Sequence, residues 1–406
     1  MGMNRGERRD LTLICVGGGV TWFGNALALI SLMLVLRPAG GFALAGLFLA
    51  DSVPLFVVAP LAGLLVDRLP NRKLMIAAQL GQGVAALGLA LSLSDLPVVF
   101  AFVALLSTGN AIARPASSAL IPALVGEDNA TRGYSWISTA SSTGMLIGTA
   151  AGGVLVAGLG AHDALLIDAL TYAVQAATLL LVRADRKPRR HPDRPNAGKQ
   201  ILAGLKFLAG DRLLIAGIGA IAAASFAGTL INVAEVFFVT VVLHGSAAIL
   251  GLMQAMWMVG LLTGARVAGR AKTVRGTALL LAGGGILSGV AFGFPAVFPL
   301  VAVLAIGYLL GGLANGIQNV CQSALIRSQT PEDMRGRAFS GSGTAVNVTG
   351  TVGNVLSGLL VTVIGARGCF AFAAGLCLLT GLAALVVNLR ITAPEALPEQ
   401  RTARTV

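Results

Sequence analysis

Three acidic residues interrupt long apolar stretches of the sequence, where their chemistry would be the handling of protons or other cations. Asp51, Asp168 and Glu235 each stand well inside a run of mostly apolar residues. A charge at the centre of a bilayer costs about 2.5–3.5 kcal/mol, so such groups often mark proton or ion pathways. The alternative is a polar group near the membrane surface that is hydrated or paired. This structural role is favoured for Asp168, whereas both interpretations stay open for Asp51 and Glu235.

A second group of charges closes one of these apolar stretches. In GLLVDRLPNRK, Asp67 and Arg68 are followed closely by Arg72 and Lys73. Asp67 could accept hydrogen bonds from the exposed N–H groups that start another helix. Gly63, one turn earlier on the same face, would let two helices approach, and Arg72 could orient the carboxylate through a charge-assisted bond. We expect these five residues to form a conformational latch; the alternative is a basic loop with an incidental acid.

Glycines at four-residue spacing form a third pattern, in GMLIGTAAGG. Gly144, Gly148, Gly152 and Gly153 would give a helix a smooth face for close packing. Membrane helices use small residues in this way because lipid provides no hydrophobic drive for their association. We predict that these four glycines pack helices together.

The composition indicates what surrounds these residues. Of the 406 residues, 56% are hydrophobic and only 11% are charged, and the mean hydropathy is +0.84. Ordinary globular chains carry about 25% charged residues, so a water-soluble fold could not hide this much apolar surface. The four cysteines lie in apolar runs without ligand spacing, which indicates neither disulfides nor a metal site. We expect lipid to surround most of the chain, and we expect no cofactor.

Apolar runs of about 20 residues are long enough to cross a bilayer as helices. We mark twelve, at 11–36, 43–66, 73–93, 97–122, 134–158, 164–182, 213–242, 247–268, 276–294, 297–325, 338–363 and 368–390. The sequence therefore predicts an all-α integral membrane protein with twelve transmembrane helices in two six-helix bundles, residues 1–182 and 213–391. A basic, proline-rich cytoplasmic linker, 183–212, would join them, and residues 392–406 would form a cytoplasmic tail.

The end of the linker, KQILAGLKFL, has an amphipathic pattern. Ile201, Leu202, Leu205 and Leu208 share one helical face, while Lys206 lies elsewhere. A helix of this kind can lie in the membrane interface. A simple lead-in to the next span explains the pattern equally well.

The distribution of basic residues predicts the orientation in the membrane. Of the 29 Lys and Arg residues, only Arg37 and Arg367 fall in connections on the far face. Because cytoplasmic loops carry the excess of these residues, both termini are expected in the cytoplasm, with the protein in a cell membrane, most simply the bacterial cytoplasmic membrane. Nucleic-acid binding is disfavoured, since no soluble domain or aromatic-interleaved patch carries the charge.

The two halves repeat each other at an offset of 205 residues. The matched pairs include Asn110 and Asn315, Gly148 and Gly353, and Gly160 and Gly365. The gap-free offset indicates a duplicated, pseudo-symmetric unit, an architecture typical of transporters with a site at the midplane between the halves. Polar and aromatic candidates for lining a substrate cavity are Asn25, Gln79, Asn110, Asn232, Asn315, Asn319 and Trp257.

The motifs quoted above resemble the major facilitator superfamily. GLLVDRLPNRK is similar to the Gly-Asp-Arg signature between the second and third helices of that family. WFGNALALISLMLVL, ARPASSALIPALV and DALLIDALTYAVQAATLLL are similar to the branch that contains macrolide-efflux proteins and the enterobactin exporter. The resemblance covers nearly the whole chain and implies the major facilitator fold.

The resemblance also implies roles for individual residues. The partner of Asp67 would lie near Arg337 to Ser340. Arg114, in the fourth helix, would join the three membrane carboxylates in proton coupling, or it could instead only extend toward the headgroups. Two departures from the family pattern stand out: Thr149 replaces a proline in the glycine signature associated with exporters, and Asn25 stands where this branch often has an acid.

From the resemblance we expect a monomeric secondary active transporter that exports small amphipathic or hydrophobic molecules, such as a drug, natural product or siderophore. Alternating access coupled to proton entry would drive it. An importer of the same fold is the alternative. An enzyme or sensor is disfavoured, because the three histidines lie in loops without a nucleophile–base pair and no soluble output domain is visible.

Overall fold

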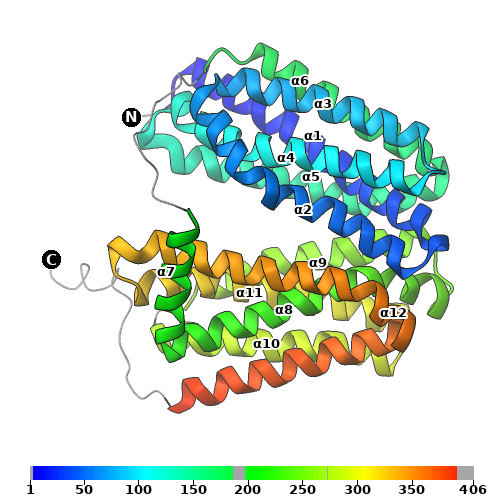
Figure 1. Ribbon diagram of the computed structural model, residues 1–406, viewed down its shortest axis with the longest axis vertical. Helices are drawn as coiled ribbons and strands as arrows, with labels where there is room; N and C mark the ends of the chain where they lie inside the picture. Colours follow the sequence, from blue (N-terminus) through cyan, green and yellow to red (C-terminus); the bar gives the residue numbers. More distant parts are fainter. Residues whose placement is uncertain (1–2, 186–196, 272, 391–406) are drawn as a thin grey trace. The chain divides into compact units, whose positions relative to one another are not determined.

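The computed structural model describes residues 3–185, 197–271 and 273–390, which contain many helices and no β-strand (Figure 1). The chain divides into two compact units. The first comprises Met1–Pro192 and Gly245–Leu252, and the second comprises Asp193–His244 and Met253–Val406. The predicted tail at 392–406 and residues 186–196 of the predicted linker lie outside the described residues.

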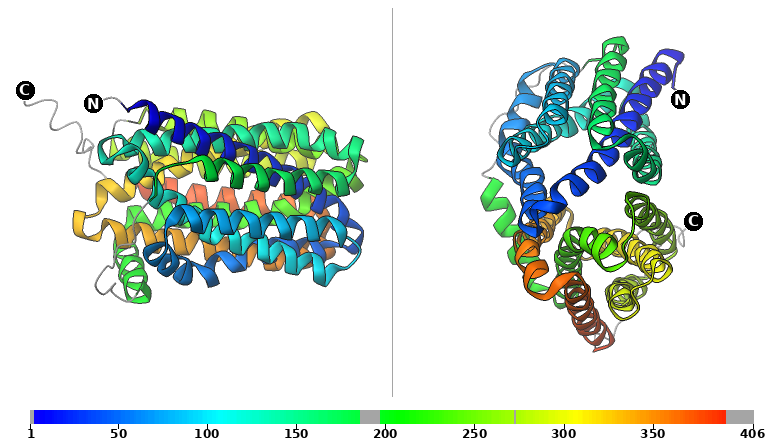
Figure 2. Two further views of the ribbon diagram at one scale, coloured as in Figure 1. Left: turned by 90° about the horizontal axis from the view of Figure 1, so that it is seen from above. Right: turned by 90° about the vertical axis from the view of Figure 1, so that its right-hand side faces the viewer.

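Six long helices build most of the first unit, and each contains an apolar stretch long enough to cross a membrane. They are α1 (Arg5–Leu36), α2 (Gly41–Arg68), α3 (Asn71–Leu91), α4 (Leu96–Val125), α5 (Ala130–Leu159) and α6 (Ala161–Leu181). α1 packs against α5 and α6, while α4 packs against α2 and α3. Figure 2 shows these helices along their length and from one end. α1 begins at residue 5 rather than at the predicted 11, because Asn4 and Glu7 form a capping box that starts the helix in polar sequence.

The second unit begins with the short helix α7 (Ala197–Gly210). The long helices that follow are α8 (Arg212–Phe237), α9 (Ala247–Ala268), α10 (Val274–Val297), α11 (Val301–Gln329) and α12 (Glu332–Arg390), and the first residues of α9 belong to the first unit. α12 is interrupted at Gly365, where the backbone is not helical, so this element comprises two spans. Counting α12 twice, the described residues contain the twelve predicted spans, and the predicted all-α, twelve-helix fold is confirmed.

The sequence repeat corresponds to the same backbone geometry in both units. Gly160 joins α5 to α6 with a φ of 85°, and its repeat partner Gly365 interrupts α12 with a φ of 68°. Both angles lie in the left-handed region, which glycine adopts without steric cost. Gly148 packs on the backbone of Phe23 in α1, and its partner Gly353 packs on the backbone of Phe226 in α8. The repeated glycines therefore occur where a chain turn or a close helix crossing requires them.

The apolar face of α7 packs against protein within its own unit. A Cβ atom at Gly341 of α12 would lie 2.8 Å from the backbone nitrogen of Leu205, so the two helices cross at backbone distance. Leu208 is buried, whereas Leu202, which was predicted to share its face, is exposed. Asp211 then caps α8 by accepting hydrogen bonds from the backbone N–H groups of Leu213 and Leu214. The structure thus shows a helix seated on α12 that leads into α8.

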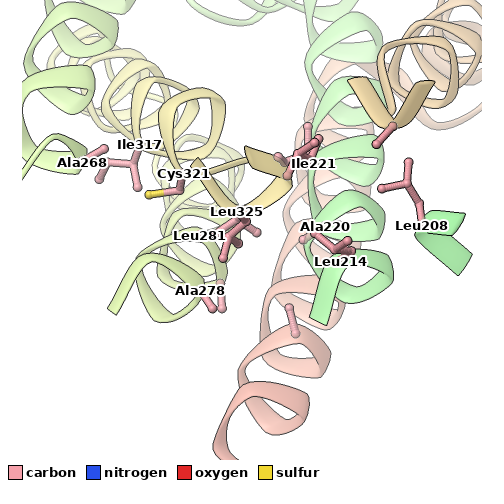
Figure 3. Packing of buried hydrophobic residues seen from close by; sticks show 14 residues of the cluster. Leu208, Leu214, Ala220, Ile221, Ala268, Ala278, Leu281, Ile317, Cys321 and Leu325 are labelled. Atoms are coloured by element: carbon pink, nitrogen blue, oxygen red, sulfur yellow. The ribbon is translucent and has the colours of Figure 1, made fainter. Parts of the chain in front are cut away.

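A buried cluster in the second unit joins α7 to the long helices (Figure 3). Leu208 of α7 lies in the same cluster as Leu214 and Ile221 of α8, Leu281 of α10 and Cys321 of α11. Lipid gives helices little hydrophobic reason to associate, so close packing of such side chains has to hold the bundle together.

One of the two basic residues in the predicted far-face connections has a structural explanation. The guanidinium group of Arg367 donates hydrogen bonds to the carbonyl oxygen of Ala296, at 3.1 and 3.0 Å, near the end of α10. A cation is favoured at this position because the last carbonyl groups of a helix lack partners and carry partial negative charge. Arg367 therefore caps a helix, which accounts for a basic residue in that connection.

Candidate functional site

A cavity of about 210 Å³ lies within the first unit and brings together several of the predicted site residues. Asp51 reaches it from α2, Arg114 from α4 and Asp168 from α6. Most of the wall is apolar by area, although seven of the eighteen lining residues are polar or charged. The lining residues are Trp22, Asn25, Ala26, Ala28, Leu29, Leu32, Leu47, Phe48, Asp51, Leu55, Val103, Leu106, Ser107, Asn110, Arg114, Met145, Asp168 and Tyr172.

The charged groups occupy different depths of this cavity. Asp51 and Arg114 are exposed, and their charges lie close enough to interact. Asp168 is only 1% exposed, and Ser107 and Tyr172 are buried as well. The cavity thus has an accessible side with one carboxylate and one guanidinium group, and an inner side with the second carboxylate.

Hydrogen bonds and one ring contact fix the polar side chains of the lining. The hydroxyl group of Tyr172 donates to Oδ1 of Asn25 at 2.7 Å, which ties α6 to α1. The hydroxyl group of Ser107 donates to the backbone carbonyl of Asp51 and so ties α4 to α2. The guanidinium carbon of Arg114 lies 5.3 Å from the ring centroid of Trp22, within the range of a cation–π interaction.

Asp168 has an unusual environment among these residues. Its Oδ1 atom is buried and has no hydrogen-bond partner in the described part of the chain. Gly24 of α1 lies directly beside it, since a Cβ atom there would meet the Asp168 carboxylate and the side chain of Thr171. Buried polar atoms are normally paired, so this unpaired oxygen, which faces Gly24, sets Asp168 apart from the other polar residues of the lining.

Helical spacing explains how single helices contribute several lining residues. Ser107, Asn110 and Arg114 stand at i, i+3 and i+7 on α4, and therefore share one face. Asp168 and Tyr172 stand at i and i+4 on α6. Asn110, Arg114 and Asp168 are predicted from the sequence; Ser107 and Tyr172 are not, although this spacing could have identified both.

Trp22 was also missed, and the same rule applies to it. It stands three residues before Asn25 on α1, so the two side chains share a face. An aromatic residue in a membrane helix is so often a packing residue that its type alone gave no signal.

Three of the four predicted packing glycines bring α5 against α1. Gly144, Gly148 and Gly152 meet α1 at Gly19, Phe23 and Leu27 respectively, one helical turn apart. Met145 of α5 lines the cavity beside this crossing. The glycine spacing therefore sets how closely α5 approaches the cavity wall.

The fourth packing glycine, Gly153, faces a different neighbour. A Cβ atom there would meet the backbone of Ala247 and lie 2.8 Å from the Cα atom of Ala248 at the start of α9, residues that belong to the same compact unit. Gly153 is therefore also a site of close approach, though with α9 in place of α1.

The third predicted carboxylate, Glu235, lies in the second unit and is fully buried. Gln254 of α9 donates a hydrogen bond to its Oε1 atom at 2.6 Å, and the hydroxyl group of Tyr308 of α11 donates to its Oε2 atom. Trp257 packs against Tyr308 with ring centroids 6.2 Å apart. Both oxygens of Glu235 thus have donors, in contrast to the unpaired oxygen of Asp168. A π-helical turn, Phe238–Val242, begins three residues after Glu235, and such turns are frequent near functional sites.

The remaining polar candidates are not among the residues that line the described cavity. Gln79 of α3 is buried and does not line it. Asn319 donates a hydrogen bond to Asn315 at 2.9 Å within α11, and Asn232 lies half-buried on α8. These three asparagines belong to the second unit, and their part in a substrate cavity remains a prediction.

The latch residues lie where α2 ends and α3 begins. Gly63 and Asp67 are half-buried in the last two turns of α2, while Arg68 and Lys73 are exposed. The side chain of Arg72 donates hydrogen bonds to the backbone carbonyls of Leu179 and Leu180 at the end of α6, at 2.9 and 2.6 Å. Arg72 thus caps α6, and its role in orienting the carboxylate of Asp67 stays a prediction.

Comparisons with known proteins agree with this architecture. The family model of the Major Facilitator Superfamily matches residues 10–271 and 219–405. The enterobactin exporter EntS of Citrobacter koseri is 30% identical over 315 residues, which are 75% of this chain and 73% of that protein. Macrolide efflux protein A of Streptococcus pyogenes is 23% identical over 385 residues, which are 90% of this chain and 95% of that protein.

A solved structure supports the fold independently. The nucleoside transporter NupG superposes with a TM-score of 0.75 at 14% identity, over 94% of this chain and 99% of that one. At this identity the likeness concerns the fold alone. The family match over nearly the whole sequence, the exporter relatives and the twelve-span fold lead to one assignment: the chain belongs to the Major Facilitator Superfamily.

Proposed function

We propose that this transporter exports small amphipathic or hydrophobic molecules, such as a drug, natural product or siderophore, in exchange for protons. The observation that carries the proposal is the cavity of the first unit, in which Asp51, Arg114 and Asp168 meet between mostly apolar walls. The apolar wall suits a substrate with a large apolar part, and the polar groups would orient it. The protein would act as a monomer in a cell membrane.

Proton coupling is supported by the position of Asp168. A charged carboxylate is costly in so buried a place, and a bound proton removes this cost. Asp51 and Arg114 lie on the accessible side of the same cavity, where a proton could be exchanged with water. Because one cavity contains both the carboxylates and the apolar wall, the proton and the substrate would bind in alternation. Glu235 is a second candidate for proton coupling, in the other unit.

The direction of transport is supported by the relatives. Two proteins with similar sequences are named an exporter and an efflux protein. The basic residues outside the far-face connections favour cytoplasmic termini, because such residues are retained in the cytoplasm during insertion. These two points support export from the cytoplasm across a bacterial cytoplasmic membrane.

Everted membrane vesicles test the coupling directly. A respiratory proton gradient quenches an acridine dye inside the vesicles, and an exchanged substrate should release part of this quenching when it is added. We expect release for some members of a panel of amphipathic drugs, and no release in vesicles without the protein. The absence of release across a broad panel would refute proton antiport.

The latch is proposed to hold the cytoplasmic side closed through Asp67. Its place in the last turn of α2, one turn after Gly63, supports this role. We expect Asp67→Asn to abolish most transport while the protein is still made and inserted. Asp95→Asn is the matched control, because this exposed carboxylate between α3 and α4 makes no side-chain hydrogen bond to the helix that it precedes. Near-normal transport by Asp67→Asn would exclude the latch.

An importer of the same fold is the main alternative. It would accumulate substrate in cells, whereas an exporter lowers the intracellular level. Comparing substrate uptake in cells with and without the protein separates the two. An enzyme or sensor has less support, because the named relatives are transporters.

A further inference from the structure

A groove of about 390 Å³ lies in the second unit, between α8 and the part of α12 that follows Gly365. Its lining residues recur at spacings of three and four along each helix, so each helix contributes one face. Both helices are long and apolar enough to cross a membrane. The lining residues are Arg212, Ile215, Ala216, Gly219, Ala220, Thr380, Ala383, Ala384 and Val387.

Small residues give the groove its depth. Ala220 and Ala384 form the floor, since both are buried and belong to the cluster of Figure 3. Gly219 leaves space above it, because a Cβ atom there would meet no neighbouring helix within 4 Å. Thr380 is the only polar lining residue besides Arg212, and its hydroxyl group donates to the carbonyl oxygen of Leu376 in its own helix, at 2.8 Å. The length of the groove therefore presents apolar surface.

Positive charge lies at one end of the groove. Arg212, the first residue of α8, is exposed there, and its side chain has no hydrogen-bond or ion-pair partner in the described part of the chain. Arg390, the last residue of α12, stands three positions after Val387 and continues the same helical face. The adjacent carboxylate of Asp211 already accepts hydrogen bonds from the backbone at the start of α8. Two arginines against one carboxylate leave this end positive.

The side chains that flank the groove indicate what surrounds it. Ile215, Leu382 and Val386 are large apolar residues, and about half of each is exposed. Exposed apolar surface on a membrane-spanning helix contacts the hydrocarbon chains of lipids. An empty groove would leave its walls without van der Waals partners, so we expect an acyl chain to fill it.

We propose that this groove binds an anionic phospholipid, with an acyl chain along the alanine floor and the phosphate group against Arg212. A guanidinium group matches the geometry of a phosphate and binds it through paired, charge-assisted hydrogen bonds. Basic pockets between membrane helices on the cytoplasmic side bind anionic headgroups, and the distribution of basic residues predicts that side for this end of the groove. A zwitterionic lipid is less suited, because its own ammonium group offsets the phosphate.

A helix from a second copy of the chain is the other candidate occupant. Small residues do favour close helix contacts in membranes. A two-fold dimer within the membrane, however, would bring Arg212 and Arg390 of both copies together at one depth, and like charges repel each other. The charge at the end of the groove therefore favours a lipid.

Native mass spectrometry of the full-length protein tests the proposal, because it counts the lipids that each protein molecule retains. The delipidated protein in detergent is titrated with phosphatidylglycerol, which is anionic, and in parallel with phosphatidylcholine of the same acyl chains, which is zwitterionic. We expect the first phosphatidylglycerol to bind about tenfold more tightly, as for one charged hydrogen bond. Arg212→Gln should remove most of this preference. Arg266→Gln is the matched control, since it removes an exposed arginine at the end of α9, outside the groove, and should retain the preference.

Filling the groove tests its apolar part separately. Gly219→Leu places a side chain where no neighbouring helix stands, so it should occupy the space of the acyl chain and weaken the binding of both lipids about tenfold. Gly283→Leu is the matched control, because this exposed glycine of α10 has equally open surroundings but does not line the groove. It should leave the binding of both lipids unchanged.

Three results would overturn the proposal. Equal affinity of the native protein for the two lipids excludes recognition of an anionic headgroup, and this comparison requires no variant to fold. Unchanged binding of phosphatidylglycerol by a folded Arg212→Gln or Gly219→Leu protein excludes the groove as its site. A dimer that is lost in Gly219→Leu and retained in Gly283→Leu assigns the groove to a second copy of the chain.

Discussion

Replacing Gly148 with alanine would force α1 and α5 apart and destabilise the first unit. A Cβ atom at this position would lie 2.6 Å from the carbonyl oxygen of Phe23, 2.8 Å from its Cα atom and 3.0 Å from the Cβ atom of Ala26. Two of these atoms are backbone, so neither can move away unless α1 itself moves. Ordinary van der Waals contact begins at 3.4 Å, so the helices must separate by about 0.8 Å.

The expected cost follows from this displacement. A radial gap of roughly 0.5–1 Å forfeits a quarter to a half of each van der Waals contact, and the same crossing includes Gly144 and Gly152. Overpacking by one methyl group typically costs about 1–3 kcal/mol. At about 3 °C per kcal/mol for a domain of this size, the midpoint of thermal unfolding should fall by roughly 3–9 °C.

Intrinsic fluorescence during heating provides the assay. In a Trp257→Phe background the remaining tryptophans, Trp22 and Trp136, both lie in the first unit and report its unfolding. Gly158→Ala is the matched control, because it adds the same methyl group to α5 where no neighbouring helix lies within 4 Å. The control should keep or slightly raise the midpoint, since alanine favours a helix over glycine by up to about 1 kcal/mol. The reasoning is refuted if Gly148→Ala melts with the parent protein or with the control.

Three further substitutions test other contacts. Arg72→Gln removes the cap on the end of α6 and should lower the free energy of unfolding of the first unit by about 1 kcal/mol, measured in the same fluorescence melt. Glu235→Ala leaves the buried donors of Gln254 and Tyr308 without an acceptor, which should lower the free energy of unfolding by about 1–3 kcal/mol for each donor. Glu235→Gln retains one oxygen and should be milder. For both variants, unfolding is followed by thiol labelling of the buried cysteines of the second unit. Gly365→Ala places a side chain at a positive φ and should cost about 1–2 kcal/mol in that assay, whereas an alanine at another exposed position of α12 should be neutral.

The twelve-helix fold could be predicted from the sequence because lipid imposes a simple length rule. A helix must present about 20 apolar residues to cross the bilayer, and each run of that length is visible in the chain. The turn between the fifth and sixth helices of each half could be predicted as well, since Gly160 and Gly365 match in the repeat. The three membrane carboxylates were identified for the same reason, because a charge in an apolar run is conspicuous.

The convergence of Asp51, Arg114 and Asp168 on one cavity was decided only by the tertiary structure. In a water-soluble helix the apolar face indicates which side is buried, but lipid is as apolar as a protein core, so the pattern of a membrane helix does not distinguish the two. The sequence therefore predicted these residue types without showing that three helices bring them together.

For the same reason the sequence does not show which single side chains of a helix contact a distant part of the chain. The hydrogen bond from Arg72 to the backbone of Leu179 joins α3 to the end of α6, a neighbour that no local pattern reveals. The sequence grouped Leu202 and Leu208 on one apolar face of α7, and only the crossing at Gly341 shows that Leu208 is buried while Leu202 is exposed. Composition and spacing determined the elements and their chemistry, and the packing of helices from distant parts of the chain determined which side chains meet.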